Sequence, residues 1–194
     1  MKLLHIDSSA LGNHSVSRQL TADIVAQVQR ARPDANIRYR DLAAQPLPHW
    51  APVADASDPD ALLGNDVMEE FLAADVIVLG APMYNFGIPS QLKAWIDRIA
   101  VAGKTFHYTA NGPEGLAGGK RVVVASSRGG FYGEGTAGAA MDFQENYLRA
   151  VFGFLGINDV EFVRAEGVAV SAENKDQALA TAREAIGTLL PKAA

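Results

Sequence analysis

Hydrophobic residues along the chain fall into two kinds of pattern, short unbroken runs and stripes with helical spacing. Residues 76–79 form the clearest run, which is too short for a helix and typical of a parallel strand covered on both faces. Similar runs within residues 3–6, 121–126 and 160–163 predict three more strands. Apolar residues alternate with arginines over residues 37–40, which predicts a strand at the sheet edge with one solvated face.

The stripes predict helices, because their apolar residues recur every three or four positions, as one face of a helix requires. Pro89 suits the first turn of the third helix, where its missing N–H costs nothing, and Gly103 suits the left-handed end of the same helix. We expect surface loops at residues 43–58 and 104–119. The five stripes lie within residues 16–28, 63–71, 92–100, 148–155 and 179–189.

Strands and helices therefore alternate five times along the chain. This alternation predicts an α/β fold, a doubly wound five-stranded parallel sheet of strand order 2-1-3-4-5, which is the flavodoxin-like arrangement. We expect residues 76–79 to lie in its central strand. With 194 residues, 48% of them hydrophobic, the chain is long enough to bury a sizeable core, and we interpret residues 1–194 as a single domain.

Composition and charge exclude several classes of function. The formal net charge of −5 and the lack of clustered Lys and Arg argue against nucleic-acid binding. The chain has no cysteine, so redox chemistry would need a cofactor. The charged N-terminus has no apolar signal core and no stretch long enough to cross a membrane, so we expect a cytoplasmic protein. The histidines lack metal-binding spacing, so we expect no metal, and we expect Lys93, Asp97 and Arg98 on a solvated helix face.

Serines follow the first predicted strand. Ser9, Ser15 and Ser17 surround the start of the first helix, where free N–H groups and the helix macrodipole favour a phosphate. The simpler interpretation, that Ser15 is only an N-cap, stays open at this point. The segment lacks the P-loop and the dinucleotide-binding glycine motif, which argues against an ATPase and against Rossmann-type NAD binding.

Two further loops join this one at the same edge of the predicted sheet. Residues 82–87 follow the third strand with aromatic and amide groups, and residues 127–130 follow the fourth. The strands before these three loops are neighbours in the order 2-1-3-4-5, so the loops should converge on one crevice. A phosphate at the first loop and a planar ring at the other two describe a mononucleotide, and FMN is the one that flavodoxin-like sheets hold there.

Four motifs in the chain resemble those of a known family. They are Asp7-Ser8-Ser9, residues 81–86 (APMYNF), residues 105–116 (TFHYTANGPEGL) and Ser127-Arg128-Gly129-Gly130. Together they resemble the FMN-dependent NADH-azoreductases, also known as NAD(P)H:quinone oxidoreductases. The resemblance covers nearly the whole chain. It implies a homodimer with one FMN per subunit at the interface, and ping-pong reduction of quinones or azo dyes by NADH or NADPH.

The resemblance also implies which residues hold the cofactor and the substrate. Tyr108 and Phe154 match positions that reach the partner's active site and, with Phe86, would line the substrate pocket. For Tyr108 packing within its own hairpin stays open, and for Phe154 so does packing in the core. Asn85 and the N–H groups of Gly129 and Gly130 would face polar atoms of the ring. By matching position, the FMN phosphate would be held by Ser9, Ser15, Val16 and Ser17, and the isoalloxazine by Met83, Tyr84, Asn85, Phe86, Ser127, Arg128, Gly129 and Gly130.

Two other functions remain open on the sequence alone. A flavodoxin-like electron carrier would use the same FMN loops but dock a protein partner instead of a small substrate. A hydrolase could instead use the serine-rich loop to bind a phosphodiester. Flavin bound to the purified protein would argue against the hydrolase, and oxidation of NADH would argue against the carrier.

Overall fold

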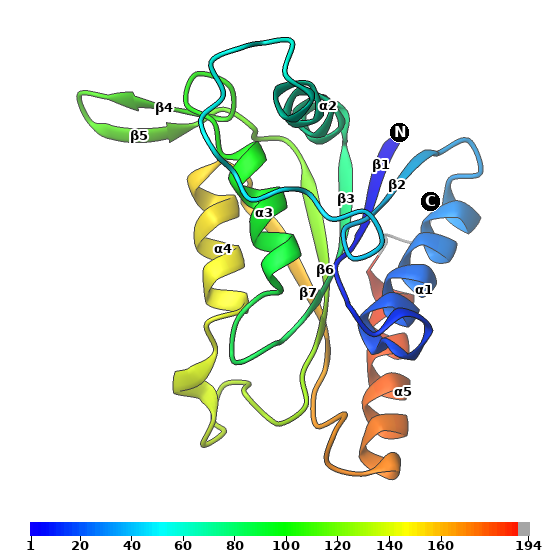
Figure 1. Ribbon diagram of the computed structural model, residues 1–194. Coiled ribbons are helices and arrows are strands. Elements are labelled where there is room, and N and C mark those ends of the chain that lie inside the picture. Colours follow the sequence, from blue (N-terminus) through cyan, green and yellow to red (C-terminus); the bar gives the residue numbers. More distant parts are fainter. Residues whose placement is uncertain (190–194) are drawn as a thin grey trace.

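The computed structural model describes residues 1–189, so the last residues of the predicted 1–194 domain lie outside the described range. The core of the structure is a five-stranded parallel sheet of order β2-β1-β3-β6-β7 (Figure 1). This is the predicted order 2-1-3-4-5, with β3 at the centre, and the doubly wound prediction is confirmed. The sheet strands are β1 (Lys2–Asp7), β2 (Asn36–Asp41), β3 (Val76–Pro82), β6 (Arg121–Ser127) and β7 (Asp159–Ala165).

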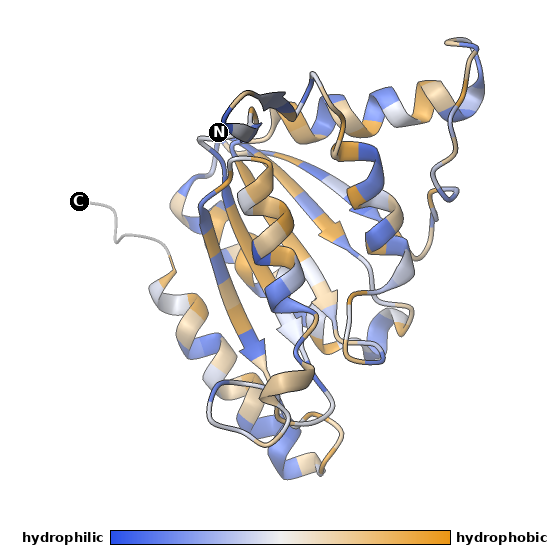
Figure 2. Cartoon of the chain, turned by 90° about the vertical axis from the view of Figure 1, so that its left-hand side faces the viewer, coloured by the Kyte–Doolittle hydropathy of each residue, from blue (hydrophilic) through white to orange (hydrophobic). Residues whose placement is uncertain are grey.

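Helices cover both faces of the sheet, which follows from strands that are apolar on both sides. The helices α1 (Val16–Ala31) and α5 (Ala172–Thr188) pack on one face, and α2 (Pro59–Ala73), α3 (Ser90–Ile99) and α4 (Glu145–Phe154) pack on the other (Figure 1). Figure 2 shows the mainly apolar strands enclosed between helices that carry both hydrophobic and hydrophilic residues. Two short 3-10 helices, η1 (Gly12–His14) and η2 (Ala139–Met141), precede α1 and α4. No helix within residues 1–189 is long and apolar enough to span a membrane.

The segment predicted as a loop at residues 104–119 contains an antiparallel hairpin instead, formed by β4 (Phe106–Thr109) and β5 (Gly112–Gly115). Its turn is closed by the Thr109 hydroxyl, which donates to the Gly112 carbonyl at 2.8 Å. The two residues between the strands are Ala110 and Asn111, and Gly112 begins β5. At its base Gly115 meets the end of α4 so closely that a Cβ there would lie 2.1 Å from the Gly156 nitrogen.

Two details of α3 also differ from the prediction. Pro89 is the N-cap residue, one position before the helix, and the helix ends at Ile99. Gly103 (φ +80°) lies beyond that end and belongs to the turn that leads into β4, where its N–H donates to the Phe106 carbonyl at 2.8 Å.

Arg98 is buried and does not lie on a solvated face. Its guanidinium donates to the Asp60 carboxylate at 2.6 Å and to the Pro48 carbonyl at 2.9 Å. Both partners lie far along the chain, so the helix pattern alone could not reveal them. Lys93 and Asp97 do lie on a solvated face, as predicted, and they form an ion pair one turn apart.

Candidate functional site

The loops after β1, β3 and β6 meet at the edge of the sheet where these strands end. The Tyr84 hydroxyl lies 3.2 Å from the Ser9 hydroxyl and accepts a hydrogen bond from the Ala10 N–H at 3.2 Å. The Met83 N–H donates to the Ser127 carbonyl at 2.8 Å. The structure therefore brings the three predicted loops into direct contact.

The start of α1 presents backbone donors beside two hydroxyls. Ser15 is the N-cap, and its hydroxyl accepts from the Arg18 N–H at 3.2 Å. A role of Ser15 in binding a phosphate, in addition to this cap, stays a prediction. The same hydroxyl lies 3.0 Å from that of Ser17. The N–H groups of Val16 and Ser17, at the first two helical positions, have no partner among the described residues. Two free N–H groups and two buried hydroxyls at a helix N-terminus form a suitable anion site.

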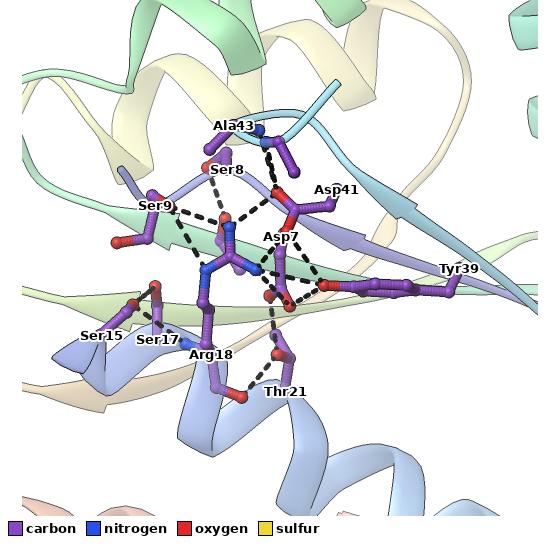
Figure 3. Close-up of polar contacts among 12 residues, drawn as sticks. Asp7, Ser8, Ser9, Ser15, Ser17, Arg18, Thr21, Tyr39, Asp41 and Ala43 are labelled. Carbon is purple, nitrogen blue, oxygen red and sulfur yellow. Dashed lines mark hydrogen bonds and ion pairs between the residues drawn. The ribbon is translucent and has the colours of Figure 1, made fainter. Parts of the chain in front are cut away.

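Arg18 lies close to this anion site, but its side chain binds carboxylates (Figure 3). Its two terminal nitrogens each lie 2.7 Å from the Asp41 carboxylate, and one of them donates to the Ser9 carbonyl at 2.9 Å. The hydrogen bond from Arg18 lowers the pKa of Asp41 to about 2, and the same bond raises the pKa of Arg18. The guanidinium charge is therefore compensated, and Arg18 fixes the backbone of the serine-rich loop.

Asp7 joins this cluster as a buried carboxylate at the end of β1. It accepts from the Thr21 hydroxyl at 2.8 Å and from the Tyr39 hydroxyl at 3.1 Å. Burial, followed by the charges of Asp7 and Asp41, raises the pKa of Tyr39 to about 12. Gly80 leaves room for Asp7, because a Cβ at residue 80 would lie 2.6 Å from the Asp7 carboxylate and displace it. Sequence analysis missed Arg18, Asp41 and Tyr39, whose polar role depends on neighbours from another strand.

The loop after β3 is a tight turn with an unusual backbone. Tyr84 and Gly87 exchange two backbone hydrogen bonds of 2.9 and 3.0 Å, which leaves Asn85 (φ +48°) and Phe86 (φ +71°) in the left-handed region. Residues other than glycine rarely adopt that region, and at about 1–3 kcal/mol each the strain is typical of ligand-binding loops. The Phe86 ring packs edge-on against Tyr132, with centroids 6.0 Å apart.

In the loop after β6, the carbonyl groups are all bound and two N–H groups are free. The carbonyls of Arg128, Gly129 and Gly130 accept from N–H groups of residues 167–169 at 2.9–3.1 Å. The N–H groups of Gly129 and Gly130 have no partner within residues 1–189. These glycines therefore offer two donors at the same edge as the α1 anion site.

Arg128 does not offer polar groups to this edge. Its side chain is fully buried, with ion pairs to Asp142 at 2.8 Å, Glu145 at 2.5 Å and Glu166 at 3.1 Å. Its N–H donates to the Ala165 carbonyl at 2.9 Å. The resemblance implied that Arg128 is one of the residues around the ring, but its guanidinium and its backbone polar groups are bound by other residues of the chain.

Tyr108 and Phe154 lie away from the three loops. The β4–β5 hairpin projects from the end of the sheet where β1 and β6 begin, opposite to the loop edge (Figure 1). Phe106 in the hairpin stacks on Phe154, with ring centroids 4.5 Å apart, and Tyr108 is 75% exposed. Within one chain these aromatic residues cannot line the site. In the described part of the chain, no group of three or more His, Asp or Glu residues could hold a metal ion.

Comparison with known proteins agrees with this geometry. Residues 1–190 match the family described as flavodoxin-like fold. The chain is 61% identical over 197 residues to the FMN-dependent NADH:quinone oxidoreductase of Sinorhizobium fredii, covering 96% of this chain and 95% of the relative. It is also 61% identical over 184 residues to FMN-dependent NADH:quinone oxidoreductase 1 of Xanthomonas axonopodis pathovar citri, covering 94% and 93%.

Solved structures give the same result. The azoreductase of Bacillus anthracis strain Sterne superimposes with a TM-score of 0.88 at 26% identity, covering 97% of this chain and 98% of the other. An FMN-dependent NADH-azoreductase of Bacillus anthracis strain Ames Ancestor, solved in complex with FMN, gives a TM-score of 0.86 at 26% identity, covering 97% and 99%. The chain therefore belongs to the flavodoxin-like family and, within it, to the FMN-dependent NADH:quinone oxidoreductases and azoreductases.

Proposed function

We propose that this protein is an FMN-dependent reductase that oxidises NADH or NADPH and reduces quinones and azo compounds. One observation carries the proposal: two sets of free N–H donors lie at the same sheet edge. One set, Val16 and Ser17, is flanked by hydroxyls, and the other set, Gly129 and Gly130, lies beside an aromatic turn. The names of the relatives, which are quinone oxidoreductases and azoreductases, support the same activity.

The residues present fit FMN in charge and in shape. A phosphate at α1 would be held by neutral donors, because the nearby Arg18 is already compensated by Asp41 and lies 3.6 Å from Asp7. The strained turn at Asn85 and Phe86 would lie against the ring, and the free N–H groups of Gly129 and Gly130 would donate to its polar atoms. The proposed phosphate ligands are Ser9, Ser15, Val16 and Ser17, and the proposed ring contacts are Met83, Tyr84, Asn85, Phe86, Ser127, Gly129 and Gly130.

When bound, FMN accepts a hydride from the nicotinamide and passes two electrons to the acceptor. The task of the chain is to position the ring and to exclude water from it. The sequence has no separate dinucleotide-binding glycine motif. We therefore propose that the nicotinamide and the acceptor use the same space in turn, in a ping-pong mechanism.

We also propose that the enzyme works as a homodimer. The three loops lie at one edge of the subunit and would cover a bound ring from one side, whereas hydride transfer needs a second wall against water. Tyr108 is exposed at the far end of the subunit, in the hairpin that projects beyond the sheet (Figure 1). A symmetric dimer can place this hairpin, with Phe154 behind it, beside the partner's ring.

The dimer proposal predicts that Tyr108 affects the acceptor and not the fold. Tyr108→Ala should raise KM for a quinone, while the molecular mass in solution and the FMN content stay unchanged. Tyr108→Phe, which keeps the ring, is the matched control. A fully active wild-type monomer, or unaltered kinetics of Tyr108→Ala with every acceptor tried, would contradict the shared site.

An absorption spectrum of the purified protein, followed by two half-reactions, tests the activity. We expect the bands of oxidised flavin, their loss when NADH is added without oxygen, and their return when a quinone is added after NADH is removed. A protein that takes up no FMN would overturn the proposal. A protein that binds FMN but is not reduced by NADH would be an electron carrier.

A further inference from the structure

Arg128 is the most completely buried charge in the described chain, and the proposed site leaves its side chain unexplained. The guanidinium is 0% exposed and forms ion pairs with Asp142, Glu145 and Glu166. Its Nε also donates to the Gln144 side chain at 3.1 Å. A buried charged group is costly unless its donors are bound, so these contacts hold the Arg128 side chain and its partners in one arrangement.

Each of the three carboxylates also binds a different segment on the ring side of the site. Asp142 lies two residues before Gln144, the N-cap of α4, and its Oδ1 accepts from the N–H groups of Gln144 and Glu145 at 3.1 and 2.9 Å. Glu145 also forms a two-bond pair with Arg164 of β7, at 2.8 and 2.7 Å. Arg128 thus ties the start of α4 and the last strand to its own loop.

Glu166 connects Arg128 to the aromatic residues Tyr132 and Phe86. Its Oε1 accepts from the Arg128 guanidinium at 3.1 Å and from the Tyr132 N–H at 2.8 Å. Tyr132 in turn packs against Phe86, the strained residue of the β3 turn. One carboxylate therefore connects Arg128 to the loop proposed to lie against the ring.

Gln144 completes the connection to β3. It is fully buried, its amide donates to the Ala81 carbonyl at 2.6 Å, and its Oε1 accepts from the Ser126 hydroxyl at 3.1 Å as well as from Arg128. Both strand ends that carry the ring loops are thus held by atoms bound to Arg128.

The consequence is the backbone orientation of the two glycines that follow. The carbonyls of Gly129 and Gly130 are held by the N–H groups of Ala169 and Gly167, at 3.1 and 2.9 Å, and the N–H groups of the two glycines have no partner within residues 1–189. Arg128 directly precedes these peptides, and Glu166, which binds its guanidinium, also accepts from the N–H of Tyr132, two residues after Gly130.

We propose that Arg128 is a positioning residue, whose buried guanidinium holds the Gly129 and Gly130 N–H groups toward the ring of bound FMN. The inference rests on the proposed function and deepens it. It differs from the contact expected from sequence, because the side chain acts through the backbone of its neighbours. The proposal also predicts that Arg128 affects binding of the flavin ring and not binding of the phosphate.

Flavin titrations test this separation. Apoprotein of the full chain is titrated with FMN and with riboflavin, which has the same ring but no phosphate. Arg128→Lys keeps the charge but has fewer donors than the guanidinium fork. It should weaken binding of both ligands by the same factor, about tenfold to a hundredfold, as expected when two backbone hydrogen bonds are misplaced.

The redox potential gives a second readout that a purely structural residue would not change. N–H donors stabilise the extra charge of the reduced ring, so Arg128→Lys should lower the two-electron potential of bound FMN. If the affinity for reduced FMN falls tenfold more than the affinity for oxidised FMN, the potential falls by about 30 mV.

Arg98→Lys is the matched control, because Arg98 is also buried and paired with a carboxylate, but at the far end of α3. It should lose thermal stability while its affinity for both flavins stays unchanged. If Arg128→Lys fails to fold, Glu166→Gln tests the proposal instead. This variant keeps an acceptor for the Tyr132 N–H and removes one negative charge from around Arg128. We expect Glu166→Gln to weaken both flavins about threefold to tenfold.

The results separate this inference from the proposed function. A wild-type protein that binds neither flavin would overturn the function itself. A wild-type protein that binds FMN, with Arg128→Lys and Glu166→Gln binding equally well at an unchanged potential, would overturn only the role of Arg128. Loss of FMN affinity with riboflavin affinity intact would also contradict the proposal, because it would assign Arg128 to the phosphate.

Discussion

Arg18 and Arg128 stand at two sides of the same loop edge, and neither turns its charge toward the proposed ligand. Arg18 is 16% exposed and binds Asp41 with two bonds, while Arg128 is 0% exposed and pairs with three carboxylates. Arg18 contacts a loop backbone directly, through the Ser9 carbonyl. Arg128 acts on its loop through side chains of other segments.

The difference shows how a site for a charged ligand can be built from neutral donors. On the phosphate side, hydroxyls and helix N–H groups meet the ligand, and one arginine fixes the loop behind them. On the ring side the free N–H groups of Gly129 and Gly130 depend for their direction on a larger buried network. Because a backbone N–H cannot re-orient as a side-chain hydroxyl can, we expect the ring side to be the more sensitive of the two to loss of its arginine.

The largest predicted effect is on stability, and it compares the two arginines directly. Arg128→Met leaves the buried Glu145 and the partly buried Asp142 and Glu166 with one remaining cation, Arg164, and should lower the free energy of unfolding by about 3–5 kcal/mol. Arg18→Met should cost less, about 1.5–3 kcal/mol, since Asp41 keeps two backbone donors, Ala43 and Ala44, at 3.0 Å each. Urea unfolding of both apoproteins measures the difference.

Arg121→Met is the control for a more exposed arginine, whose side chain is 26% exposed and pairs with Glu161 at 2.6 Å. We expect a loss of about 1 kcal/mol or less there. Equal losses for Arg18→Met and Arg128→Met would show that burial does not distinguish the two clusters.

The strand order and the loop positions could be predicted from the sequence because each depends on local patterns. The apolar run at residues 76–79 marked the central strand, and alternation over residues 37–40 marked the edge strand β2. The β4–β5 hairpin is also local, although the prediction placed a loop there. These features depend on the sequence within a few residues.

The arginine clusters could not be predicted in the same way. Arg98 pairs with Asp60, 38 positions away, and Arg128 with Glu166, also 38 positions away. From the sequence alone, an exposed arginine cannot be distinguished from one that is buried in an ion pair. The backbone orientation of Gly129 and Gly130 likewise could not be predicted, because their carbonyls are bound by N–H groups of the loop after β7.

A second prediction, smaller in free energy, sharpens the contrast between the phosphate and ring sides. Ser17→Ala removes a hydroxyl from the proposed phosphate site and should weaken FMN by about 1.5–3 kcal/mol, or about tenfold to a hundredfold. Riboflavin affinity should not change, in contrast to Arg128→Lys. Fluorescence titration of apoprotein with each flavin measures both values.

Ser171→Ala is the control for the loss of a serine that contacts no flavin loop, since Ser171 caps α5. Its affinity for both flavins should equal that of the wild type. Normal FMN affinity in Ser17→Ala and in Ser15→Ala would show that the start of α1 is not the phosphate site.

The smallest predicted effect depends on pH and reports the phosphate-side cluster alone. The hydrogen bond from Arg18 holds the pKa of Asp41 at about 2, below its ordinary value of 3.8. The stabilisation is therefore complete above about pH 4 and is lost as the pH falls toward 2, because the folded state then takes up a proton that the unfolded state already holds. Since the pair is partly solvated, we expect about 1 kcal/mol. Urea unfolding should find the wild type more stable than Asp41→Asn by this amount at pH 5, with the gap closing near pH 2. A gap that stays constant between those pH values would mean that Asp41 acts by packing, and that Arg18 holds Ser9 without needing the charge of its partner.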